Sequence, residues 1–339
     1  MRKRLDEVTI LRPLAIFLVV FYHSFAIYDG KWPLPEGVIP SNCYNWLADI
    51  AYSFMLPLFV LMSGYLFSFQ LNEKESRVTF ISLLNNKFRR LLIPCYTFGI
   101  LYLLIIQRPL HFHFGSIVSS LLDGVGHLWF LPMLFWCFIA SYTLHRQFKL
   151  STWQVLSLCL ILYLVVPKTL PFRIGYSCWY FIYFEIGYYL RHNISFVRSR
   201  IKPLAAYSGI FYIVLFLIIS VMFNHSDSPT GSIRYFYAAF NKIGSLGYGI
   251  FGCIFVFCIS LFITEKHRTL PKFISEVDKL CFGVYIYHQF ILKILYYNTK
   301  IIAINTPFLP WCSLFVTILT SLLLAYITRL SIIGRKLIG

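Results

Sequence analysis

Long apolar stretches recur along the whole chain, separated by short polar segments. We count ten of them, and most are about twenty residues long, the length that a helix needs to cross a bilayer core of roughly 30 Å. Their approximate limits are 9–28, 45–69, 91–107, 127–144, 152–166, 176–190, 203–223, 243–264, 280–297 and 309–330. This pattern predicts an all-α polytopic membrane protein with about ten transmembrane helices.

Composition supports the membrane interpretation. Of the 339 residues 58% are hydrophobic and only 13% are charged, which is more apolar than a soluble domain of this size requires. We find no internal repeat, no glycine-rich phosphate loop and no nucleophile elbow. The sequence therefore predicts one membrane-embedded domain over residues 1–339.

Basic residues alternate in density from one connection to the next. The N-terminus, the tail and the connections near 70–90, 145–151, 191–202 and 265–279 hold 21 of the 30 lysines and arginines, whereas the other five connections hold 7. Because basic loops stay in the cytoplasm, we expect both termini there, in a multi-pass protein of a bacterial inner membrane. The net charge of +17 is thus explained by topology and anionic lipid rather than by nucleic acid.

The nine cysteines show no Cys-x-x-Cys pair and no zinc-ligand spacing, so we expect small core residues and no metal site. The basic start of the chain superficially resembles a signal peptide. Arg12 and Pro13 interrupt its apolar core, and we expect no cleavage.

Two ionisable residues, Arg12 and His23, lie inside the first apolar stretch. Eleven residues make almost three helical turns, so both side chains leave one face of the helix, separated by about 16 Å along its axis. A charged side chain in hydrocarbon is costly enough that a functional role is the default interpretation.

Four further motifs follow in order. They are PLFVLMSGYL at 57–66, KFRRLLIP at 87–94, HLWFLP at 127–132 and GVYIYH at 283–288. With the Arg12/His23 pair, they make the chain resemble the acyltransferase-3 family of integral-membrane acyltransferases, whose hallmark is an arginine and a histidine separated by ten residues in the first span. Lys87 departs from the pattern, because the family often has arginine there.

The resemblance implies transfer of an acyl group, usually acetyl from acetyl-CoA, onto a hydroxyl of a surface polysaccharide or its lipid-linked precursor. Acetyl-CoA would be a substrate, and no permanently bound cofactor is expected. Arg12, Lys87, Arg89 and Arg90, with Ser63 nearby, would hold the donor near the cytoplasm, since basic side chains pair well with phosphate. Membrane anchoring also explains the three basic residues at 87–90, and Ser63-Gly64 also fits simple close packing of helices.

The chemistry needs a base for the acceptor hydroxyl and a partner for the oxyanion. His23 is the best candidate base, and its ring is equally able to accept the acyl group itself. We expect His127 and Trp129 to line the acceptor entrance, although interfacial anchoring explains them equally well.

Glu185 is the one carboxylate that we place deep within a span, where it must be paired or protonated. Arg12, His23 and Lys293 are the candidate partners, and we hypothesise that Glu185 orients or charges one of them. His288 lies near mid-depth and is either a supporting catalytic residue or a hydrogen-bonded structural one.

Two other classes of protein compete with the enzyme. Buried Arg, His and Glu also occur in a transporter or an exporter of a glycan or small solute, although the two halves of this chain show no inverted repeat. A scaffold without chemistry leaves the shared face of Arg12 and His23 unexplained.

Overall fold

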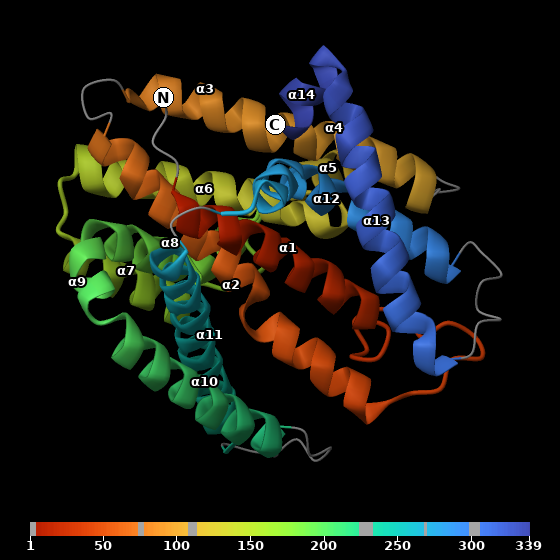
Figure 1. The fold of residues 1–339 in the computed structure, drawn as a ribbon, viewed down its shortest axis with the longest axis horizontal. Helices are drawn as coiled ribbons and strands as arrows, with labels where there is room; N and C mark the ends of the chain where they lie inside the picture. Colours follow the sequence, from red (N-terminus) through yellow and green to blue (C-terminus); the bar gives the residue numbers. More distant parts are fainter. Residues whose placement is uncertain (1–4, 74–77, 108–113, 224–232, 268–269, 298–305) are drawn as a thin grey trace.

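The structure is a computed structural model of the chain, and it describes residues 5–73, 78–107, 114–223, 233–267, 270–297 and 306–339. The regular elements over these ranges are all helical (Figure 1). The main helices are α1 (Asp6–Phe25), α2 (Asn42–Glu73), α3 (Phe80–Lys87), α4 (Ile93–Tyr102), α5 (Phe114–Asp123), α6 (Phe130–Tyr142), α7 (Thr152–Val165), α8 (Ile174–His192), α9 (Ile194–Ser199), α10 (Ile201–Phe223), α11 (Ile233–Lys266), α12 (Lys272–Tyr297), α13 (Leu309–Leu330) and α14 (Ile332–Ile338).

Short turns of other helix types extend several of these helices. The π-helical segments are η1 (Phe88–Leu92), which joins α3 to α4, η2 (Leu103–Gln107) and η4 (Thr143–Gln147), and the 3-10 segments are η3 (Gly126–Trp129) and η6 (Thr306–Phe308). Ser151 caps the N-terminus of α7, and its side chain accepts a hydrogen bond from the backbone N–H of Gln154 at 3.4 Å. A serine at this position satisfies one of the free N–H groups at a helix start.

All ten predicted stretches are helical in the structure. Seven helical stretches in the described ranges are long and apolar enough to cross a membrane. Two of them join several elements, Phe80–Gln107 from α3 to η2 and Gly126–Gln147 from η3 to η4. Of the predicted spans, α7, α8 and α12 are not among these seven: α7 has only 14 residues, and α8 and α12 are rich in tyrosine, which lowers their hydropathy. The all-helical membrane architecture is therefore established, and a total of ten crossings stays a prediction.

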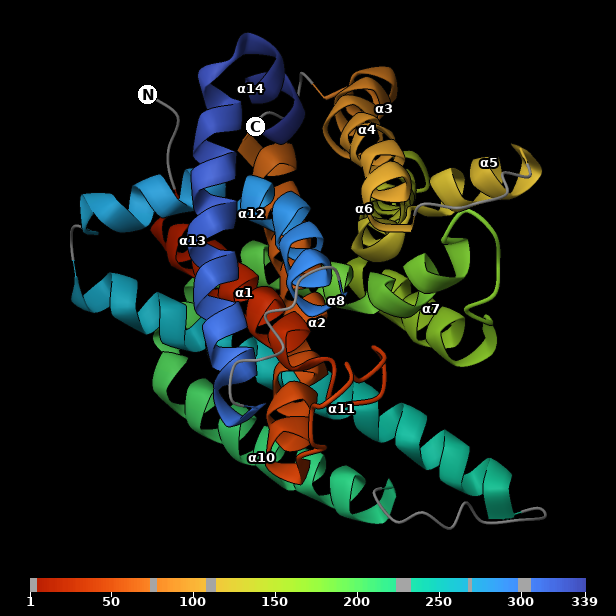
Figure 2. The ribbon, with the colours of Figure 1, turned by 90° about the vertical axis from the view of Figure 1, so that its right-hand side faces the viewer.

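Helix α1 lies inside the bundle, where it contacts α2, α11, α12 and α13. Figure 2 shows α1 and α2 at the centre, α10 and α11 at one end and the α3, α4 and α6 group to one side. The first span thus packs against four other helices, while Leu14 and Phe17 remain exposed on its outer side.

Helices α2 and α8 cross with their backbones in close approach. A Cβ atom on Gly64 would lie 1.9 Å from the carbonyl oxygen of Phe184, and one on Gly187 would lie 1.9 Å from that of Leu61. Only glycine fits at either position, which supports the packing interpretation of Gly64. Ser63 donates its hydroxyl to the carbonyl of Phe59 in its own helix at 2.8 Å.

Connections that the charge pattern places on one side of the membrane contact one another in the structure. The contacts are Glu7–Arg198, Leu71–Arg146 and Lys279–Arg329 on the basic side, and Pro33–Tyr297, Tyr44–Pro307 and Asp123–Arg173 on the other. This grouping agrees with the alternation of basic loops. The cytoplasmic location of the basic side remains a prediction from sequence.

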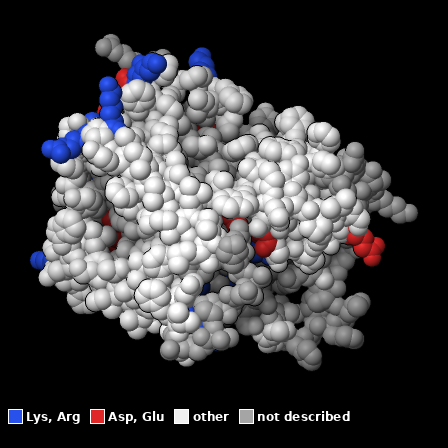
Figure 3. All heavy atoms as spheres, turned by 90° about the horizontal axis from the view of Figure 1, so that it is seen from below, with Lys and Arg blue, Asp and Glu red and all other residues white. Residues whose placement is uncertain are grey.

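The outward face of α10 is apolar. Ile210, Phe211, Val214, Leu217 and Val221 are all exposed. Figure 3 views the molecule from the side on which α10 lies, and few charged atoms appear across that face. An exposed apolar patch of this extent is stable against lipid rather than water.

Candidate functional site

Helices α1 and α12 lie side by side and run in the same direction. Near their N-terminal ends, Arg12 Nη1 is 2.5 Å from Asp278 Oδ1, and eleven and ten residues further on the rings of His23 and His288 lie 4.9 Å apart. Arg12 and His23 therefore both face α12. This confirms the prediction that they share one face of the first helix.

The orientation of the His23 ring is fixed by its own helix. Its Nδ1 lies 2.8 Å from the carbonyl oxygen of Val19. Because a carbonyl oxygen only accepts hydrogen bonds, Nδ1 must carry the hydrogen. In the neutral ring, Nε2 is then the nitrogen with a free lone pair, the atom that a general base or a nucleophile requires.

His288 is fully buried beside His23. Its Nδ1 lies 2.7 Å from the carbonyl oxygen of Tyr285, so this nitrogen is also the donor. Its Nε2 is buried with no hydrogen-bond partner among the described residues. Such an unsatisfied nitrogen is uncommon in a protein interior and marks this ring as a candidate for proton transfer.

The third histidine, His127, comes from η3 and is held against α12. Gln289 Oε1 lies 3.0 Å from the backbone nitrogen of His127 and 2.8 Å from its Nδ1, and Tyr285 donates its hydroxyl to the His127 carbonyl at 2.6 Å. The His127 and His288 rings are 4.8 Å apart. We call His23, His127 and His288 the histidine cluster.

The sequence predicted these three histidines as separate candidates, and the structure brings them together. The described residues contain no group of three or more His, Cys, Asp or Glu side chains arranged to hold a metal ion. Trp129 does not join the cluster. Its ring lies 4.8 Å from that of Tyr176 and 6.1 Å from that of Tyr180, both on α8.

Asp278, the partner of Arg12, is not among the residues predicted from the sequence. It lies in the connection at 265–279, which the sequence marks only as rich in basic residues. The Arg12 side chain is 31% exposed and that of Asp278 is 10% exposed. The Arg12 side chain thus stays partly accessible while one of its five-donor guanidinium's nitrogens contacts the carboxylate.

The remaining predicted donor residues do not share one surface. The Lys87 ammonium lies 3.3 Å above the Phe138 ring and 5.9 Å from that of Phe67, so it faces α6 and α2. Arg89 and Arg90 are exposed on η1. Their part in donor binding stays a prediction.

Glu185 is fully buried, and its partner is His145, at 2.7 Å between Oε2 and Nε2. The His145 ring also stacks on Tyr188, with centroids 4.3 Å apart. The expectation that Glu185 pairs with Arg12, His23 or Lys293 is therefore wrong. His145 was overlooked because it lies where the apolar stretch ends, and only the packing of η4 on α8 shows that it is buried.

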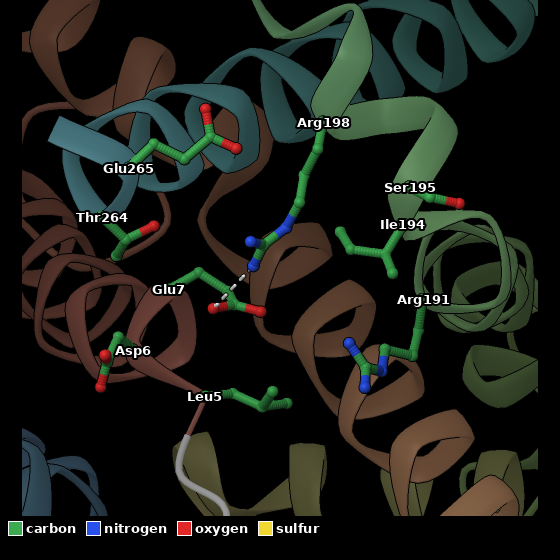
Figure 4. A pocket seen from close by; sticks show the side chains of 9 residues that line it. All are labelled: Leu5, Asp6, Glu7, Arg191, Ile194, Ser195, Arg198, Thr264 and Glu265. Atoms are coloured by element: carbon green, nitrogen blue, oxygen red, sulfur yellow. Dashed lines mark ion pairs between the residues drawn. The ribbon is translucent and has the colours of Figure 1, made fainter. Parts of the chain in front are cut away.

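A cavity of about 530 Å³ opens at the predicted cytoplasmic end of α1. Figure 4 shows Glu7 and Arg198 pointing toward each other there, at 3.8 Å, with Arg191 nearby. Glu7 is 3% exposed, so Glu185 is not the one buried carboxylate of this bundle. Asp6 and Glu265 also line the cavity, and three carboxylates against two guanidinium groups disfavour a polyphosphate.

The described helices define a membrane protein with a histidine cluster buried beside its first span. A family model for an acyltransferase domain matches residues 5–330, which is almost the whole chain. The chain belongs to the acyltransferase-3 family and is a multi-pass membrane acyltransferase that acts on an acyl donor and an acceptor. No curated protein and no solved structure shows significant similarity to it.

Proposed function

We propose that the protein moves an acetyl group from acetyl-CoA onto a hydroxyl of a surface polysaccharide or its lipid-linked precursor in a bacterial inner membrane. One observation carries the proposal. Nδ1 of His23 is held by Val19, which leaves Nε2 as the basic atom beside the buried rings of His127 and His288 in an acyltransferase bundle.

His23 acts as the general base in this scheme. Its Nε2 takes the proton of the acceptor hydroxyl while the hydroxyl oxygen attacks the acetyl carbonyl carbon. The carbon–sulfur bond then breaks, and the imidazolium returns the proton to the leaving thiolate of coenzyme A. The same nitrogen also serves an acyl-histidine route, in which it attacks the thioester itself and passes the acetyl group on.

Arg12 is the proposed anchor for the donor phosphates. It lies about 16 Å from His23 along the helix axis, on the same α12-facing side of α1. The pantetheine arm of the coenzyme would extend along this face from the basic end of the bundle to the histidine cluster.

Replacing His23 tests the chemistry. For His23→Ala and His23→Gln we expect acetyl transfer to fall by about a hundredfold or more, the usual contribution of a general base. The measurement is release of free coenzyme A by purified, folded protein, together with the mass of the surface glycan. His192→Ala, at the exposed end of α8, is the matched control and should behave as wild type.

Normal transfer by folded His23→Ala would contradict the proposal. Movement of a glycan across the membrane by a His23→Ala variant that consumes no acetyl-CoA would favour the exporter instead. Radiolabelled acetyl found on His23 after brief exposure to acetyl-CoA would select the acyl-histidine route over the general-base route.

A further inference from the structure

A second cavity, of about 310 Å³, lies beside the histidine cluster, on the side away from Arg12. Its lining comes from the loop after α1, from the end of the α4–η2 helix and from the last turns of α12. The residues are Pro33, Tyr102, Ile106, Gln107, Lys293 and Tyr297. These segments lie on the side of the bundle opposite to the basic connections.

Aromatic rings connect this cavity to the cluster. The Trp32 ring lies 5.6 Å from the His23 ring, and the Lys293 ammonium lies 3.7 Å from the centre of the Trp32 ring. Tyr102, which lines the cavity, has its ring 6.1 Å from that of His127. Two residues that line the cavity thus adjoin the cluster, Lys293 through the Trp32 ring and Tyr102 by its contact with His127.

Lys293 brings a positive charge with no acidic partner among the described residues. Its ammonium lies over the rings of Trp32 and Tyr297, at 3.7 and 4.8 Å. Lys31, in the loop after α1, differs, because its ammonium pairs with Asp29 at 3.2 Å. A partly buried ammonium against aromatic faces is stabilised by those rings, yet it still favours an anion when one enters.

The cavity wall is fixed before any ligand arrives. Tyr297 donates its hydroxyl to the carbonyl of Pro33 at 2.7 Å, and Tyr296 donates to the carbonyl of Ser24 at 2.6 Å. These bonds tie the last turn of α1 and the loop after it to the end of α12. Preorganised walls reduce the entropy that binding would otherwise cost.

We propose that this cavity binds the acceptor sugar and that Lys293 selects an acceptor with an anionic group, a carboxylate or a phosphate, close to the hydroxyl that is acylated. The rings of Tyr102 and Tyr297, which line the cavity, supply apolar faces for contact with the sugar. The inference rests on the proposed function, because it names the acceptor class for the same reaction. A carboxylate would belong to an acidic sugar and a phosphate to a glycosyl phosphate.

Protection of Lys293 from chemical acylation tests binding without any enzyme activity. The purified protein is treated with an amine-reactive ester alone or with methyl glucoside, methyl glucuronide or glucose 1-phosphate, and labelled lysines are quantified by mass spectrometry. We expect an anionic sugar, supplied at about ten times its Kd, to slow labelling of Lys293 by about tenfold, because labelling slows in proportion to the fraction of protein left without ligand. The neutral sugar should not do so, and Lys31 serves as the internal reference.

Kinetics of Lys293→Gln test the same inference through the reaction. We expect the KM for the protecting anionic sugar to rise about tenfold more than the KM for methyl glucoside. Lys31→Gln, which removes a lysine that already has a carboxylate partner, should keep the wild-type preference for the anionic sugar.

The two proposals fail in different ways. Equal labelling of Lys293 with all three sugars, or an unchanged preference in Lys293→Gln, overturns the acceptor inference and leaves acetyl transfer intact. Protection of Lys293 in a wild-type protein that never releases coenzyme A supports the anion site and contradicts the proposed function. Protection by glucuronide alone identifies an acidic sugar, whereas protection by glucose 1-phosphate alone identifies a glycosyl phosphate.

Discussion

At the scale of single residues, the contact between His23 and Val19 decides which ring nitrogen is available as a base or a nucleophile for the proposed mechanism. The Nδ1–carbonyl distance of 2.8 Å fixes the tautomer, because a hydrogen must lie between the two atoms. The neighbouring His288 ring, at 4.9 Å, keeps a buried nitrogen without a partner in the described residues. The proposed mechanism would therefore bring proton transfer and acyl transfer together at this place in the bundle.

Arg12 gives a prediction at this scale. For Arg12→Ala we expect the KM for acetyl-CoA to rise about tenfold to a hundredfold, since a hydrogen bond between charged groups contributes roughly 1.5–3 kcal/mol. The measurement is coenzyme A release as a function of acetyl-CoA concentration in purified protein.

The double variant Arg12→Ala/Asp278→Ala separates donor binding from structure. Arg12→Ala alone leaves the Asp278 carboxylate without its guanidinium partner, which lowers the yield of folded protein. The double variant should recover that yield and keep the high KM. Recovery of the wild-type KM would instead make Arg12 a structural partner of Asp278.

At the scale of helices, the close packing of α2 on α8 fixes the position of these two helices relative to each other. The two helices meet where Gly64 and Gly187 leave no room for a Cβ atom. On α8, Glu185 lies between Phe184, which Gly64 contacts, and Gly187. Its carboxylate is paired with His145 of η4. A shift of α8 would therefore displace the Glu185 carboxylate and disrupt the packing of α8 against α2.

Gly187 gives a prediction at this scale. For Gly187→Val we expect a loss of at least about 1–3 kcal/mol of stability, because the added atoms collide with the backbone of Leu61. Thermal unfolding in detergent measures the change. The control is Gly115→Ala on α5, where no other atom lies within 4 Å of the new Cβ. A Gly187→Val protein as stable as that control would contradict the close crossing.

At the scale of the whole molecule, the connections between helices divide into two sets, one on each side of the bundle. Contacts form between members of the same set. The large apolar face of α10 lies between the two sets (Figure 3). Arg12 and the second cavity, with Lys293, lie toward opposite sides of this bundle. Donor and acceptor would thus approach the histidine cluster from opposite sides.

The orientation can be tested with two exposed native cysteines. Cys43 and Cys312 are exposed and lie beside connections that we predict to be outside the cell. We expect a membrane-impermeant maleimide to label both while the membrane is intact. Cysteine introduced by Ser199→Cys, in a predicted cytoplasmic connection, should be labelled only after permeabilisation. The reverse result would invert the topology.

The sequence by itself determined the membrane class, the helical segments, the shared face of Arg12 and His23 and the family. These features depend on local periodicity, on loop charge and on motifs that lie within single helices, so they can be read along the chain. The tertiary structure decided the contacts between helices. It showed that Asp278 pairs with Arg12, that His145 pairs with Glu185, and that three distant histidines form one cluster beside Lys293. The physical reason is that such contacts depend on which helices become neighbours, and packing across the whole bundle selects those neighbours.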